Sequence, residues 1–285
     1  MAIFTMVIGL GRSGKSTYAA KYADNTGATL VEWYETNSTK TYGRWLKYMT
    51  DLLAEGHDIV LDGGPLNANR RARLIRILPE CTKQCVIMAT PFHVCIERWN
   101  KTSTEELFKQ RKSFEPPYYN EGWDTIEFKF ADVLLDNADH FKMELEFDQK
   151  NSHHRYTVGN HECKASGYAV DQGFDKVIDL AAKFHDCGKI YCQTIHSDGE
   201  AHYPSHANIG AYQLMTMFSF KKFVQFYGDE ALETLALVAW HMTPYQFKRC
   251  ESPRQALMDW CESKEFDKSF AEHLWQLHTA DVWAH

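Results

Sequence analysis

The chain has 285 residues, of which 44% are hydrophobic and 24% charged. This is an ordinary globular composition for about two domains, and it excludes disorder, collagen or coiled coil for the whole chain. No apolar run approaches the roughly 18 residues that a membrane span needs, so no membrane partner is expected. The apolar N-terminus lacks the basic region and cleavage site of a signal peptide, which predicts a cytoplasmic protein with reduced cysteines.

Charge and histidine are unevenly distributed. Residues 1–112 hold 16 Lys and Arg against 11 Asp and Glu, whereas residues 113–285 hold 15 against 27. Eleven of the 14 histidines lie between 153 and 285. The first part can therefore attract phosphates, and the acidic, histidine-rich part is typical of a metal-dependent hydrolase, although a chance surface bias would give the same numbers.

Residues 1–135 alternate strand-like and helix-like runs, which predicts a parallel sheet with helices on both faces. Strands are expected at 3–9, 28–33, 57–63 and 83–90, and helices at 15–25, 41–56, 68–80 and 103–114. Further strand-like runs occupy 125–148. A polar stretch then suggests a boundary between domains 1–148 and 149–285. Helices are expected at 175–192, 208–228, 229–242 and 254–283, so an α/β domain precedes an all-α domain.

The segment GLGRSGKST at 9–17 matches GxxxxGK[ST] between a strand and a helix. Its glycines let successive N–H groups point at phosphate oxygens, and the helix dipole assists. Lys15 can bridge the β- and γ-phosphates of ATP, and Ser16 can hold Mg²⁺. The residues expected to bind the nucleotide are Gly9, Gly11, Arg12, Ser13, Gly14, Lys15, Ser16 and Thr17.

Acidic residues follow the next two expected strands. Asp62 stands where a P-loop enzyme places a second acid near the metal or acceptor, or it is a surface aspartate. Glu32 or Glu35 could accept the proton of an attacking hydroxyl. The arginines of 70–76 spread round a helix, either for solvation or to favour a phosphate-rich acceptor.

Three segments, GLGRSGKST, IVLDGGPLNANRRARLI and CIERWNKTSTEELFKQRKSFEPPYYNEGWDTI, resemble the kinase module of phage-type polynucleotide 5′-kinases over about residues 1–130. The resemblance implies that Glu35 is the base, that Asp62 is the acid of a D-x-N-x-N-x-x-R-R segment, and that Arg98 is the first lid arginine.

This chain departs from that family in two places. Ser38 stands where the family has an acceptor-binding arginine, and Thr102 replaces the second lid arginine. Either Lys101, Arg111 or Arg44 substitutes, or the acceptor differs.

Adjacent His185 and Asp186 follow an apolar helical run, and an adjacent His–Asp pair can bind one ion together while the carboxylate bridges to a second. His161 lies 24 residues before His185, and His206, His241 and Asp281 follow at intervals of 20, 35 and 40 residues. Imidazole and carboxylate suit Mn, Fe, Zn, Ni or Mg rather than Cu(I).

The segments HHRYTVGNHECKAS, LAAKFHDCGK, SHANIGA, LVAWHM and LHTADVWAH resemble the HD-domain metallophosphohydrolases throughout 150–285. The resemblance implies one metal site formed by His161, His185, Asp186 and Asp281. It implies a second site completed by His206 and His241 and bridged by Asp186. Lys189 would sit near the substrate phosphate. One or two divalent metals are therefore expected.

A kinase joined to an HD phosphatase resembles bacteriophage-like RNA end-healing enzymes. The leading hypothesis is ATP- and Mg²⁺-dependent 5′-hydroxyl phosphorylation with 3′-phosphatase activity, and with 2′,3′-cyclic phosphodiesterase activity as an extension. Its partners would be single-stranded or nicked nucleic acid ends, RNA favoured, with a functional link to an RNA ligase. The alternatives are a nucleoside or small-molecule kinase fused to an HD nucleotidase, and a regulatory module that binds ATP and metal without turnover.

Overall fold

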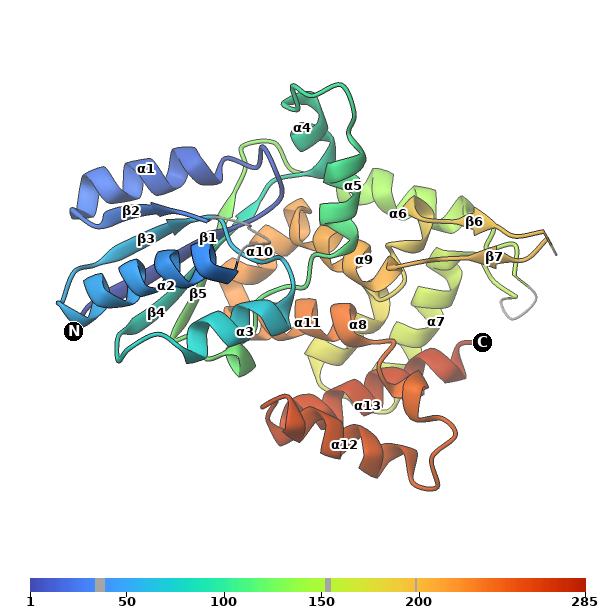
Figure 1. Ribbon diagram of the computed structural model, residues 1–285. Coiled ribbons are helices and arrows are strands. Elements are labelled where there is room, and N and C mark those ends of the chain that lie inside the picture. The colour runs from blue at the N-terminus through green and yellow to red at the C-terminus, as the bar shows by residue number, and fades with distance from the viewer. Residues whose placement is uncertain (34–38, 152–154, 198) are drawn as a thin grey trace. The chain divides into compact units, whose positions relative to one another are not determined.

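The computed structural model describes residues 1–33, 39–151, 155–197 and 199–285 (Figure 1). The chain forms two compact units. Unit 1 comprises Met1–Gln110 and Pro117–Val133, and unit 2 comprises Arg111–Pro116 and Leu134–His285. The boundary expected between 148 and 149 falls inside unit 2, because helix α6 (Asn137–Glu146) packs against helix α7 (Val158–Asp171) there.

Unit 1 is built on a five-stranded parallel sheet in the order β2-β3-β1-β4-β5. The strands are β1 (Ile3–Ile8), β2 (Thr29–Glu32), β3 (Ile59–Asp62), β4 (Thr82–Ala89) and β5 (Thr125–Phe130). The central strands β1 and β3 are short apolar runs buried on both sides, as expected for a sheet covered on two faces. Because all strands are parallel, their carboxyl ends meet at one edge of the sheet.

The helices of unit 1 follow the right-handed crossover rule, which places α1 on one face of the sheet and α2 and α3 on the other. Figure 1 shows this arrangement. The helices are α1 (Lys15–Thr26), α2 (Thr39–Ala54), α3 (Ala68–Arg76), α4 (Phe92–Glu97) and α5 (Glu105–Lys112), with a 3₁₀ turn at Tyr119–Glu121. The residues of α5 beyond Gln110 belong to unit 2.

A buried ion pair fixes α3 to the 3₁₀ turn. Arg71 Nε and Nη2 donate to the two carboxylate oxygens of Glu121 at 2.8 and 2.6 Å, and both side chains are fully buried. Arg71 Nη1 also donates to the carbonyl oxygens of Pro65 and Leu66, and Trp123 Nε1 donates to Glu121 Oε2. Among the arginines of 70–76, Arg71 is therefore a structural residue and does not face a phosphate-rich acceptor.

Replacing Arg71 by methionine should destabilise the protein by about 3–5 kcal/mol, because Glu121 would remain buried without its counter-charge. Urea denaturation measures this change. Arg73, which is exposed on the same helix, is the matched control, and Arg73→Met should stay within about 0.5 kcal/mol of the wild type. Equal effects of the two substitutions would contradict a structural role for the buried pair.

In its described residues, the regular structure of unit 2 is helical apart from a two-stranded antiparallel hairpin. Its elements are α6 (Asn137–Glu146), α7 (Val158–Asp171), α8 (Lys176–Phe184), a 3₁₀ turn at Lys189–Tyr191, β6 (Thr194–Ile195), β7 (Ala201–His202), α9 (His206–Met215), α10 (Phe218–Tyr227), α11 (Asp229–Trp240), a 3₁₀ turn at Pro244–Phe247, α12 (Pro253–Ser263) and α13 (Lys268–Trp283). The predicted fold class, an α/β domain followed by an all-α part, is confirmed. No helix in the described ranges is both long and apolar enough to cross a membrane.

The element predictions for unit 2 need three corrections. The strand-like reading of 125–148 is right for β5 and wrong for Asn137–Glu146, which forms α6 with an N-cap bond from Ala138 N–H to Asp136. The misleading signal is an apolar alternation that includes the exposed Met143 and Leu145, whereas the buried face of α6 carries His140 and Glu144. The single helices expected at 208–228 and 254–283 are each two helices, and α7 was not predicted.

Candidate functional site

The glycine-rich segment forms a tight loop between β1 and α1. Gly14 caps α1 in the left-handed region, with φ at 100°, and Arg12 also has a positive φ of 65°. Ser13 N–H donates to the Leu10 carbonyl at 3.2 Å, and Thr90 Oγ1 donates to the Ser13 carbonyl at 2.8 Å. The loop therefore lies at the carboxyl edge of the sheet, directly before the positive end of a helix dipole.

Lys15 lies at the start of α1 and reaches back over the loop. Its Nζ donates to the Leu10 carbonyl at 2.7 Å. Burial lowers the pKa of Lys15, and the carboxylate of Asp62 at the end of β3 offsets part of that shift. The structure thus brings the charges of Lys15 and Asp62 within electrostatic reach of each other.

A pocket of about 700 Å³ opens beside the loop, with Lys15, Ser16 and Thr17 among its lining residues. Three further cations line it, namely Arg12, Lys21 and Arg98. Arg98 ends α4 and is exposed, so the predicted lid arginine does face the pocket of the loop. Four cationic side chains therefore surround one pocket, which gives it a positive potential.

The segment after α4 covers part of the loop. A Cβ on Gly11 would lie 2.6 Å from the Trp99 ring, and Gly11 N–H donates to Gln110 Oε1 at 2.7 Å. An Arg12–Asn100 hydrogen bond adds a third contact. The sequence did not single out Gln110, Trp99 or Asn100, because nothing in their spacing from the glycine loop indicates the contact.

Several residues predicted for the kinase site are not among the described residues that line the pocket beside the loop. Glu35 and Ser38 lie outside the described residues. Glu32 is exposed at the end of β2, and its backbone carbonyl accepts a hydrogen bond from Trp45 Nε1 at 3.0 Å. Of the cations considered as a replacement for the lid arginine, Lys101 lies over the Trp99 ring, and Arg111 is buried over Tyr191 in unit 2.

Five helices of unit 2 bring the six predicted metal ligands together. His161 lies on α7, Asp281 on α13, and His206 is the first residue of α9. His185 and His241 end α8 and α11, and Asp186 follows His185 directly. All six are buried although they are polar.

Asp186 divides the cluster into two halves. Its Oδ2 lies 3.6 Å from His161 Nε2 and 3.5 Å from His185 Nε2, and its Oδ1 lies 3.4 Å from His206 Nε2 and 3.7 Å from His241 Nε2. Asp281 Oδ1 belongs to the first half, at 3.0 Å from His161 Nε2 and 3.4 Å from His185 Nε2. The division matches the two ligand sets that the sequence implies.

The orientation of the imidazoles fits bound cations. Nδ1 of His185, His206 and His241 lies 2.8–2.9 Å from the carbonyl oxygens of Ala182, Tyr203 and Val238 respectively. A proton on Nδ1 satisfies each carbonyl, so Nε2 presents a lone pair. His206 and His241 Nε2 lie only 3.1 Å apart, and two lone pairs at that distance repel unless a cation lies near both.

The two halves of the cluster differ in the pKa values of their histidines. Burial alone would raise the pKa of Asp186, but the Lys189 ammonium and the His185 imidazole hold it well below its usual range. Burial opposes a charged His185, yet Asp186 and Asp281 raise the pKa of His185 to about 9. Burial and the neighbouring His206 and His185 lower the pKa of His241 to about 3. Cations at this cluster would therefore displace a proton from His185 and find His241 already neutral.

A pocket of about 380 Å³ gives access to the cluster, and Asp186, Lys189, His206 and Asp281 line it. Lys189 Nζ lies 2.6 Å from Asp186 Oδ2 and donates to Gln149 Oε1 at 3.0 Å, so the predicted phosphate-facing lysine does reach this pocket.

Sequence reasoning missed four neighbours of the cluster. Tyr245 donates to Asp281 Oδ2 at 2.8 Å, and His285 Nε2 lies 3.6 Å from Asp281 Oδ1. Gln149 accepts from Lys189, and Glu162 Oε1 accepts from Asp186 N–H at 3.0 Å. Glu162 directly follows His161, which was the one available signal. The other three have no spacing that relates them to the ligands.

The turn that carries Asp186 is packed directly against α9. A Cβ on Gly188 would lie 2.0 Å from the His206 carbonyl oxygen and 2.6 Å from Gly210 N. Gly188→Ala should therefore separate the turn from α9 and destabilise the protein by about 3 kcal/mol in urea denaturation. Gly167→Ala is the control, because its Cβ would meet nothing within 4 Å on helix α7. A neutral Gly188→Ala would show that this close approach does not contribute to stability.

Comparisons with known proteins give distant similarities. No family model matches the chain. Over 152 residues it is 30% identical to Transcription factor bHLH140 of Arabidopsis thaliana, and the match covers 48% of this chain and 17% of that protein. The chain thus spans about a sixth of the length of that relative.

Two solved structures match part of the chain with low TM-scores. A sugar kinase from Janibacter sp. HTCC2649 is 17% identical with a TM-score of 0.36, covering 45% of this chain and 86% of that one. A gluconokinase from Sinorhizobium meliloti 1021 is 16% identical with a TM-score of 0.32, covering 44% and 80%. The activities named belong to those two proteins.

Proposed function

We propose that the chain is a bifunctional enzyme of phosphate chemistry. Unit 1 transfers the γ-phosphate of ATP to a hydroxyl group, and unit 2 hydrolyses a phosphoester. Support for the first activity comes from the phosphate loop, its four-cation pocket and the Lys15–Asp62 pair. The two oxygens of Asp186, each facing its own pair of imidazoles, carry the proposal for the second.

In unit 1 the chain acts by positioning and charge neutralisation, which dominate phosphoryl transfer. Backbone N–H groups at the start of α1 and in the loop before it would cradle the β-phosphate. Lys15 would exchange its bond with the Leu10 carbonyl for phosphate oxygens, and Ser16 would help to hold Mg²⁺. Arg98 neutralises charge on the transferred group from the lid side. Asp62 lies at the strand edge where the acceptor hydroxyl must approach.

In unit 2 the cluster fits two divalent cations, held by His161, His185, Asp186 and Asp281 on one side and by Asp186, His206 and His241 on the other. Cations bound there supply Lewis-acid charge for phosphate oxygens and lower the pKa of water. Lys189 orients the phosphate at the mouth of the pocket. Tyr245 holds Asp281 through its hydroxyl and thereby fixes the first ligand set.

For the substrate we propose the two ends of a broken nucleic acid, with RNA favoured. One chain that adds a phosphate and removes another suits a strand with a 5′-hydroxyl and a 3′-phosphate, because both ends must be converted before a ligase can join them. The resemblance of unit 1 to polynucleotide 5′-kinases and of unit 2 to HD phosphohydrolases supports this choice.

The test uses an oligoribonucleotide with a 5′-hydroxyl and a 3′-phosphate, incubated with the full-length protein, ATP, Mg²⁺ and Mn²⁺. We expect a 5′-phosphate and a 3′-hydroxyl, resolved by gel mobility and mass. A 2′,3′-cyclic end is included as a further substrate. No change at either end, with active ATP and metal binding, would overturn the nucleic-acid assignment.

A nucleoside or small-molecule kinase joined to a nucleotidase is the second candidate. The buried Arg71–Glu121 pair favours it, because it withdraws an arginine from the acceptor side of unit 1. Free nucleosides and mononucleotides, assayed beside the oligonucleotide at equal concentration of ends, distinguish the two. A polynucleotide enzyme should leave the monomers unchanged.

A further inference from the structure

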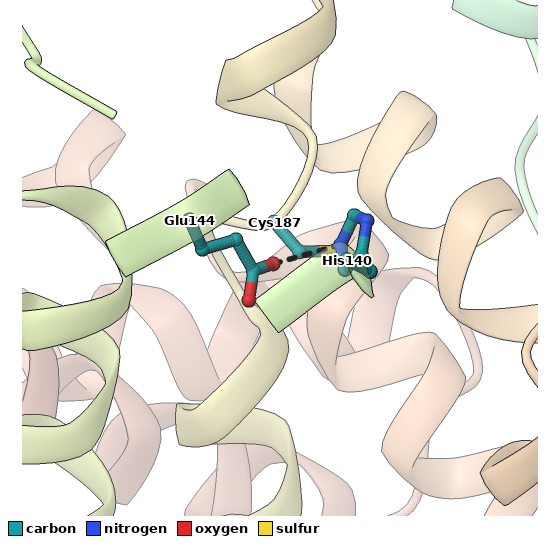
Figure 2. A group of neighbouring side chains, drawn as sticks. All are labelled: His140, Glu144 and Cys187. Carbon is teal, nitrogen blue, oxygen red and sulfur yellow. Dashed lines mark ion pairs between the residues drawn. The ribbon is translucent and has the colours of Figure 1, made fainter. Parts of the chain in front are cut away.

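A second group of metal-ligating side chains lies in unit 2, outside the ligands described above. It consists of His140 and Glu144 on α6 and Cys187 in the turn after α8 (Figure 2). One ligand atom from each lies within 4.8 Å of the other two, and all three side chains are buried. His140 and Glu144 are four residues apart, so both project from one face of the helix towards Cys187.

The group is short of hydrogen bonds within the part of the chain that the structure describes. Glu144 Oε1 and Oε2 and His140 Nε2 are buried without a hydrogen-bond partner there. His140 Nε2 and Glu144 Oε1 lie 2.8 Å apart but not in hydrogen-bonding geometry. A fully buried carboxylate whose oxygens have no hydrogen-bond donor among the described residues is costly, so the two oxygens of Glu144 point to a missing cation.

Neighbouring residues prepare His140 as a ligand. Tyr191 Oη lies 2.9 Å from His140 Nδ1 and accepts from Gln213 Nε2 at 3.0 Å. When Nδ1–H donates to the hydroxyl oxygen, Nε2 carries the lone pair and faces Glu144 and Cys187. An outer partner on one ring nitrogen that fixes the other towards a metal is the usual arrangement around ligating histidines.

We propose that His140 Nε2, a carboxylate oxygen of Glu144 and Cys187 Sγ bind one Zn²⁺ ion. Thiolate, imidazole and carboxylate together suit zinc, whereas Mg²⁺ and Ca²⁺ prefer oxygen alone. A fourth ligand comes from water or from Glu162, whose Oε2 is also buried without a partner among the described residues.

The ion would have a structural role that neither proposed reaction includes. Cys187 directly follows Asp186, so zinc here would fasten α6 to the turn that carries the bridging carboxylate. The side chains of this group and of the Asp186 cluster belong to separate sets, and of the candidate metal-binding groups among the described residues only this one offers a sulfur ligand.

The sulfur ligand gives the site its own spectroscopic signature. The full-length protein is stripped with a chelator and reloaded with Co²⁺, and its near-ultraviolet absorption is recorded. We expect a thiolate-to-cobalt charge-transfer band, which a site made of imidazole and carboxylate cannot produce. Cys187→Ser should abolish the band, and Glu144→Gln and His140→Gln should each lower bound cobalt by one equivalent.

Two variants separate this site from its neighbours. Cys192→Ser removes another buried cysteine of the same unit and should keep the band. Asp281→Asn alters the other cluster and should keep it as well. A wild-type protein that binds cobalt without the band, or a band that survives in Cys187→Ser, overturns the proposal. If Cys187→Ser fails to fold, the wild-type spectrum and Glu144→Gln still decide.

Discussion

Lys15→Ala should reduce phosphate transfer from ATP by at least about 100- to 1000-fold, the usual cost of removing one preorganised charged donor from the reacting group. The Lys15 ammonium lies within electrostatic reach of Asp62 and donates to the Leu10 carbonyl of the loop. Alanine removes this ammonium group entirely. Transfer of labelled γ-phosphate to a 5′-hydroxyl oligonucleotide measures the loss. Hydrolysis of a 3′-phosphate should remain at the wild-type rate.

Lys21 supplies the matched control. It lines the same pocket but is exposed one to two turns further along α1, so Lys21→Ala should change transfer by less than about 10-fold. Equal losses in the two variants would mean that net positive charge, and not the placement of Lys15, supports the reaction. Loss of both activities in Lys15→Ala would indicate that the two units depend on each other.

The sequence predicts unit 1 well because its signals are local. Apolar runs of four to eight residues alternate with amphipathic runs, and β1, the glycine loop and α1 follow one another without interruption. The sequence could not predict which individual polar residues are buried in ion pairs and which are exposed. Arg71 looks like its neighbour Arg73, and only packing shows that one is buried against Glu121 while the other is exposed.

Unit 2 shows a different limit. Apart from the adjacent His185 and Asp186, the predicted ligands stand 20 to 40 residues apart, and no periodicity connects such positions. The resemblance to HD phosphohydrolases selected His161, His185 and Asp281 from many candidates, and helix packing then brings them within 3.0–3.4 Å of one another. Tyr245 touches Asp281 from a 3₁₀ turn that no sequence pattern marks.

Helix α6 is the clearest failure of pattern reading. A helix normally shows itself by an apolar stripe on its buried face. Here the fully buried positions include His140 and Glu144, and the apolar alternation of exposed residues imitates a strand. The same two residues belong to the proposed zinc site. A buried polar face is therefore both the reason for the wrong strand prediction and the sign of a ligand.

Asp186→Asn should reduce phosphoester hydrolysis by at least about 1000-fold and leave kinase activity intact. The amide keeps the size of the side chain but loses its negative charge and one of its two oxygens, so it can no longer supply a charged oxygen to each half of the cluster. Release of inorganic phosphate from a 3′-phosphate oligonucleotide measures the loss, and metal analysis should show fewer bound ions.

The stability of Asp186→Asn must be measured as well, because Asp186 is the ion-pair partner of the buried Lys189. The Lys189 ammonium is paired with Asp186 at 2.6 Å in a buried position, so the amide leaves a buried charge with a weaker partner and should lower the melting temperature. Asp171→Asn, at an exposed position of α7, is the matched substitution and should change neither rate nor stability. If Asp186→Asn remains folded and still hydrolyses the 3′-phosphate, the bridging carboxylate is not part of the reaction centre. If Asp186→Asn loses kinase activity as well, the two reaction centres are coupled. The proposal that units 1 and 2 act independently would then be wrong.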